Sequence, residues 1–79
     1  MKKKKALLLG VGFDGRKGHV RITRGENFYL YGGSQRTHTE LQEKAMSFNE
    51  QLQKRRKKLE DISPEEFRDI ASDIGLKQI

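Results

Sequence analysis

The chain changes its physical character within YLYGGSQRT, residues 29–37. Before Gly32 the sequence is rich in glycine and in alternating apolar and polar residues, whereas after Ser34 the apolar residues recur at helical spacing. Residues 1–36 hold nine Lys and Arg against Asp14 and Glu26, while the remainder holds eight basic and nine acidic residues. The segment therefore separates a strand half from a helix half, and the net charge of +6 lies on the strand half.

Three strands are expected before the junction, at about residues 6–13, 16–24 and 28–32. Asp14-Gly15 is a strong signal for a type I′ turn, which would pair the first two strands as an antiparallel hairpin. That register gathers apolar residues on the face expected to pack on the core: Leu7, Leu9, Val11, Val20 and Ile22.

The turn before the third strand leaves two registers open, because a loop of residues 25–26 and a loop of residues 25–27 put opposite faces of that strand on the core. The three-residue loop aligns Phe28 and Leu30 with the apolar face of the second strand. We prefer it because the shorter loop would bury Arg21 and Thr23.

Two helices are expected after the junction, at about residues 38–60 and 64–74. The first has a capping box of Thr37 and Glu40 and an apolar stripe at helical spacing. The stripe consists of Leu41, Ala45, Phe48 and Leu52. The second helix has Ser63 as N-cap, Pro64 at its first position, Glu66 completing a capping box and Gly75 as its stop signal.

These elements predict an α+β fold, in which a three-stranded antiparallel β-meander is followed by a helical hairpin packed on one face (βββαα). Residues 6–79 form one domain, and residues 1–5 form a flexible basic N-terminal tail. A chain of 79 residues buries only a thin core. Without cysteine it has no disulfide framework, which suits a cytoplasmic location. No segment approaches the roughly 20 apolar residues that span a membrane.

The leading hypothesis is a nucleic-acid-binding module, with DNA or RNA as the partner. The predicted register places cations and tyrosines on the sheet face opposite the core, where cations neutralise phosphates and tyrosines stack on bases. The binding residues would be Lys17, His19, Arg21, Tyr29 and Tyr31. Auxiliary phosphate contacts would come from Arg24, Arg36 and the basic run of residues 54–58, with Lys54, Arg55 and Lys58 as its main contributors. The alternative for this run is the favourable effect of cations at a helix C-terminus.

No motif indicates catalysis. The chain has only His19 and His38 as histidines, and no spacing of ligands suggests a metal. Residues 10–15 match G-x-G-x-x-G, but a hairpin in place of a following helix argues against a dinucleotide cofactor. We therefore expect a non-enzymatic protein without a catalytic, cofactor or metal site. Residues 32–34 either present N–H groups to a phosphate or connect a strand to a helix, and we favour the connector.

A protein-interaction or homodimerising module is the competing hypothesis. Met46 falls off the apolar stripe of the first helix, and a thin core leaves apolar surface for a partner to cover. A dimer would hide either Met46 or the face that carries the tyrosines.

Overall fold

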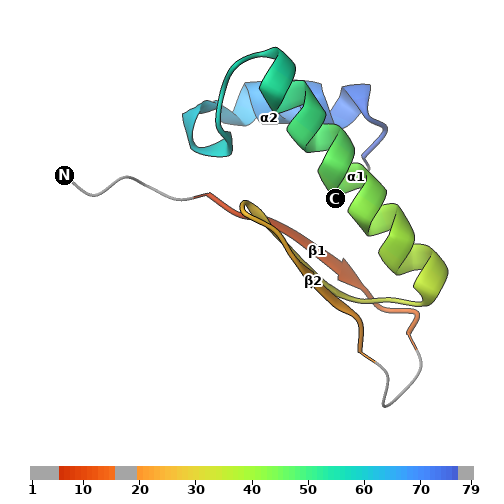
Figure 1. Cartoon of the computed structure of the whole chain (residues 1–79). Coiled ribbons are helices and arrows are strands. Elements are labelled where there is room, and N and C mark those ends of the chain that lie inside the picture. Colours follow the sequence, from red (N-terminus) through yellow and green to blue (C-terminus); the bar gives the residue numbers. More distant parts are fainter. Residues whose placement is uncertain (1–5, 16–19, 77–79) are drawn as a thin grey trace.

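The computed structural model of the chain describes residues 6–15 and 20–76, and it has a three-stranded sheet with its helices on one face (Figure 1). The expected α+β class is confirmed, while the predicted tail of residues 1–5 lies outside the described residues. The elements are β1 (Leu8–Gly12), β2 (Ile22–Arg24), β3 (Phe28–Gly32), α1 (Gln35–Lys54), the 3-10 helix η1 (Leu59–Asp61) and α2 (Pro64–Asp73).

The sheet is mixed, with β3 in the centre. Its strand order is β1-β3-β2, with β1 parallel and β2 antiparallel to β3. The predicted antiparallel meander is therefore wrong, and Asp14-Gly15 does not join two paired strands. The Asp14 carboxylate instead accepts hydrogen bonds from the start of α1, and β2 lies at the sheet edge opposite β1. A tertiary contact thus replaces the local turn that the dipeptide favours.

The connection from β2 to β3 follows neither loop considered from the sequence. Arg24 pairs with Tyr29, and the Gly25 N–H donates to the Phe28 carbonyl at 2.9 Å. The preferred three-residue loop is wrong, and Thr23 pairs with Leu30 on the face that α1 covers. Burial of this hydroxyl is tolerated because α1 supplies polar partners for it.

The helix layer consists of α1 lying across β1 and β3, with α2 packed on α1 (Figure 1). The Ser34 hydroxyl accepts from the Thr37 N–H, so α1 begins at residue 35 and the expected capping box at Thr37 does not start it. The helix ends at Lys54, and Arg56 has a positive φ of 54°. The predicted end near residue 60 is therefore wrong. The buried core lies between the helices and η1 and contains Phe48, Leu52, Leu59 and Ile70.

The bounds of the second helix match their prediction, because the signals at its two ends are local, but the predicted capping box with Glu66 is wrong. The Ser63 hydroxyl accepts from the Glu66 N–H at 3.1 Å, Pro64 opens the helix, and Gly75 follows it with φ of 76°. The Glu66 carboxylate does not close a capping box but accepts from Lys57 and Arg55, and these hydrogen bonds lower the pKa of Glu66. Within the described part of the chain, neither helix combines the length and the apolar character needed to cross a membrane.

Candidate functional site

The sheet face away from the helices is apolar and exposed. The register places Leu9, Tyr29 and Arg24 in one row across this face and Val11, Tyr31 and Ile22 in the next. Leu7 and Val20 extend the same alternation beyond the strand ends. We call this set the open face; its members are Leu7, Leu9, Val11, Val20, Ile22, Arg24, Tyr29 and Tyr31.

The apolar residues of the open face are unusually exposed to solvent. Leu9 is 68% exposed, Ile22 is 51% exposed and Tyr31 is 43% exposed. Directly after β1, Phe13 is 92% exposed. Contiguous apolar surface of this kind marks interaction sites in soluble proteins.

The five aliphatic residues expected to share a face do lie on one side of the sheet, but the prediction that this side packs on the core is wrong. The reason is the packing of the opposite face, where Gly10 and Gly12 alternate with the aliphatic residues. A Cβ atom on Gly12 would lie 2.6 Å from Gly33 Cα, so the start of α1 sits closer to β1 than any side chain would allow. The helices therefore cover the glycine side and leave the leucine side open.

Tyr29 and Tyr31 are the two predicted nucleic-acid-binding residues that the structure places on the open face. The Arg24 guanidinium lies over the Tyr29 ring, 5.7 Å from its centroid, in a cation-π contact. Arg21 belongs to the other side, where its Nη1 donates to the Gly33 carbonyl at 3.4 Å. Lys17 and His19 lie outside the described residues.

The other predicted cations lie in the helix layer. Arg36 is an exposed residue of the first turn of α1, 3.6 Å from Glu40. Arg55 contacts Glu66 and Asp73 of α2, at 3.1 and 3.7 Å. Lys54, the last residue of α1, and Lys58, which follows the helix, are both exposed. The basic run therefore does not join the tyrosines in one surface, and part of it is engaged in ion pairs within the domain.

The start of α1 already holds a carboxylate from this chain. Asp14 accepts from the Thr37 hydroxyl at 2.6 Å, from the Ser34 N–H at 2.9 Å and from the Ser34 hydroxyl at 3.0 Å. The hydrogen bond from Thr37, followed by that from the Ser34 backbone, lowers the pKa of Asp14 to about 2. The connector interpretation of residues 32–34 is thus the one that the structure supports, because an internal anion occupies the N–H group that a phosphate would need.

A second polar network is buried beneath the sheet. Its central residue, His38, is 6% exposed. Its Nδ1 lies 2.9 Å from the Gly32 carbonyl and its Nε2 lies 2.7 Å from the Thr23 hydroxyl. The oxygen of this hydroxyl accepts a hydrogen bond from Gln42 at 3.0 Å. A carbonyl can only accept, so Nδ1 donates to Gly32, and in the neutral tautomer with this proton Nε2 accepts from Thr23. Each polar group of this network has a hydrogen-bond partner, which indicates a structural role.

Residues 6–15 and 20–76 contain no group of three or more His, Asp or Glu side chains placed to hold a metal ion. No protein-family model matches this chain, and neither a curated protein nor a solved structure gives a significant match. The open face and the edges of the sheet are therefore the candidate functional surfaces.

Proposed function

We propose that this chain is a non-enzymatic, self-associating interaction module, in which two copies pack the open faces of their sheets together. The observation that carries the proposal is the pair of rows across β1, β3 and β2, in which exposed aliphatic side chains lie beside the exposed Tyr31 and the half-buried Tyr29. Two such sheets would stack as in a β-sandwich, with the helices on the outside. A cytoplasmic location is part of this proposal and is supported by the absence of cysteine.

The size of the open face suits a second copy. Its exposed apolar residues amount to roughly 600 Å² per chain, at the upper end of the largest patch on a typical monomer. Two copies would bury roughly 1,200 Å², which is near the lower limit for a specific interface. We therefore expect a weak to moderate dimer and not an obligate one.

The charge distribution permits this contact. Arg24 is the one charged residue of the open face as defined above, and it lies against Tyr29. The described cations of residues 54–58 lie at the far end of α1, in the helix layer. As far as the described residues go, the apolar rows of two copies can therefore meet without bringing clusters of like charge together, and salt screens the remaining repulsion.

Sedimentation equilibrium tests the proposal with the full chain at protein concentrations up to about 1 mM. Ile22→Glu should weaken the dimer more than about 100-fold, because the interface would bury unpaired carboxylates. Met46→Glu is the matched control, since Met46 is 62% exposed but lies on α1. A wild-type chain that stays monomeric would refute the proposal, as would a dimer that survives Ile22→Glu or dissociates with Met46→Glu.

Nucleic-acid binding is the second candidate, and the contact between Arg24 and Tyr29 beside Tyr31 favours it. A cation next to two aromatic rings is suited to a single strand, whose bases stack while its phosphates are neutralised. It ranks second because the aliphatic residues of the same face offer nothing to a phosphate backbone.

Fluorescence anisotropy with labelled single-stranded DNA and RNA tests this second candidate. Affinity should fall with salt, with a slope of about 0.7 per phosphate contact. Tyr31→Ala should weaken binding by about 1–3 kcal/mol, whereas Tyr31→Phe should retain it. An absence of binding at low salt would exclude this function.

A further inference from the structure

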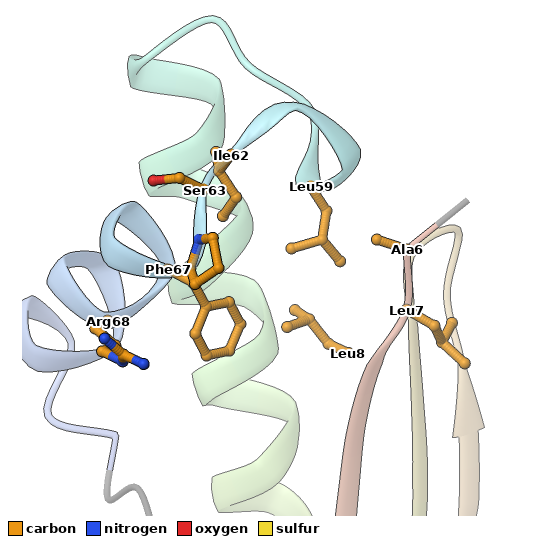
Figure 2. Close-up of a pocket in the computed structure, with 9 residues that line it drawn as sticks. Ala6, Leu7, Leu8, Leu59, Ile62, Ser63, Phe67 and Arg68 are labelled. Atoms are coloured by element: carbon orange, nitrogen blue, oxygen red, sulfur yellow. The ribbon is translucent and has the colours of Figure 1, made fainter. Parts of the chain in front are cut away.

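The helix layer extends past the edge of the sheet at β1. The second helix contacts α1 more than it contacts any strand. Between α2, η1 and β1 lies an open cavity of about 410 Å³, lined by apolar side chains and Arg68. Figure 2 shows Phe67 of α2 and Leu8 of β1 pointing toward each other across this space, with Leu59 above them. The helices thus cover a space beside β1 that no strand of the described chain fills.

A second cavity, of about 180 Å³, continues this groove along β1. It shares Leu7, Leu8 and Phe67 with the first and ends near Gly10, Leu41 and Leu76. The two cavities together follow most of the length of β1, so the groove matches an extended chain better than a compact ligand.

Among residues 6–15 and 20–76, no strand pairs with the outer edge of β1. The Leu8 N–H donates to the Asn27 carbonyl of the neighbouring strand at 2.8 Å. Alternate residues of a parallel strand direct their backbone groups to the same neighbour, so Leu8, Gly10 and Gly12 pair with β3. The N–H and C=O groups of Leu9 and Val11 consequently point away from the sheet.

This edge lacks the features that normally protect an edge strand. Residues 7–12 contain no charge and no proline. The other edge strand, β2, has three residues, one of which is Arg24. Of the two edges, β1 is therefore the one suited to pairing.

Charge indicates the chemistry of the partner. Arg68 and Lys44 line the groove, and no acidic residue lines either cavity. In the sequence, Lys2 to Lys5 directly precede Ala6, which also lines the groove. A second copy of β1 would bring its own four lysines to these cations, whereas a segment flanked by Asp or Glu would complement them. An acyl chain would fill the groove but leave the edge groups of Leu9 and Val11 unpaired.

We propose that the outer edge of β1 and the adjoining groove bind an extended, acidic and apolar segment of another protein as a fourth strand. Alternate side chains of this segment enter the groove beneath Phe67, and its backbone pairs with Leu9 and Val11. The inference does not depend on dimerisation, because the segment would pair with the outer backbone groups of β1 and enter the groove on the helix side, whereas the dimer would use the side chains of the open face.

The test uses the full chain carrying Ile22→Glu and a labelled peptide, Glu-Glu-Val-Thr-Val-Thr-Val-Thr-Glu-Glu. We expect saturable binding by anisotropy, weakened about fivefold or more by Arg68→Glu. Arg36→Glu makes the same charge change at the other end of the helix layer and should leave the affinity unchanged. A peptide with Lys in place of Glu, and one with a central proline, should both bind at least about tenfold more weakly.

Hydrogen exchange identifies the mode of binding. Saturating peptide should slow exchange of the Leu9 and Val11 amides, while the amide of Gly10, paired with β3, changes little. The proposal is overturned by an absence of peptide binding, by equal binding of the three peptides, or by unchanged exchange at Leu9 and Val11. Binding of dodecanoate without binding of the peptide would assign the groove to an acyl chain and likewise overturn it.

Discussion

Gly12→Ala distinguishes the observed sheet from the hairpin that the sequence favours. The two arrangements predict changes of opposite sign in the free energy of unfolding. In the structure an added Cβ would lie 2.6 Å from Gly33 Cα, 2.9 Å from Gly33 N and 3.0 Å from the Thr37 methyl. The first two are backbone atoms and cannot rotate away, so β1 must move from the start of α1. Overpacking of this kind costs about 1–3 kcal/mol.

The alternative hairpin would place Gly12 on an uncovered face. Alanine there would stabilise the protein by about 0.4–1 kcal/mol, since it restricts the unfolded chain. Gly10→Ala is a graded control, because its nearest atoms, 2.8 and 3.2 Å away, are the side-chain methyls of Leu30 and Leu41. Those side chains can rotate, so we expect a smaller loss than at Gly12.

Urea denaturation followed by circular dichroism measures both changes at constant m-value. A loss of about 1–3 kcal/mol corresponds to a fall in Tm of at least about 4 °C for a domain of this size. A Gly12→Ala variant as stable as the wild type, or more stable, would refute the parallel placement of β1.

Three further perturbations test the local contacts. Hydrogen bonds that lower the pKa of Asp14 to about 2 stabilise the fold above about pH 4, the range of an unfolded aspartate, and this contribution disappears as the pH falls toward 2. Asp14→Asn should therefore make the urea midpoint depend less on pH between pH 4 and 2. A variant whose midpoint falls as steeply with pH as that of the wild type would contradict this. Thr23→Val should cost about 1–3 kcal/mol in urea unfolding by leaving the buried Nε2 of His38 unpaired, whereas Thr23→Ser should cost less. Gly75→Ala should cost about 1–2 kcal/mol, measured in the same way, because φ is 76° there, and a neutral result would argue against the left-handed helix end.

The second helix and the apolar stripe of the first were predictable because their signals lie within a few residues of the structure they specify. Ser63, Pro64 and Gly75 mark the two ends of α2, and their roles depend on hydrogen bonds to near neighbours in the chain. The end of α1 was not predictable, because the basic run of residues 54–58 has good helix formers throughout. Contacts of Arg55 and Lys57 with Glu66 accompany the end of the helix there.

For the candidate site, the sequence indicated which residues share a face but not which face is covered. Val11 and Ile22 alternate with smaller or more polar residues, and Leu9 lies two positions before Val11, so a common side is predicted for the three. Apolar chemistry then favours placing that side in the core. The combination of Gly10 and Gly12 on the opposite side was the available signal for close approach of a helix.

The amino-acid sequence by itself determined the α+β class, the order of strands and helices, the start and end of α2, and the concentration of positive charge before residue 37. These follow from composition, periodicity and capping, which act over a few residues. Tertiary structure alone decided that β1 pairs in parallel with β3, that Asp14 binds the start of α1, and that the leucine side of the sheet stays open. The physical reason is that strand pairing and face burial are set by contacts between distant segments. Close packing of Gly12 on Gly33 and three hydrogen bonds to Asp14 outweigh the local preference of Asp14-Gly15 for a turn.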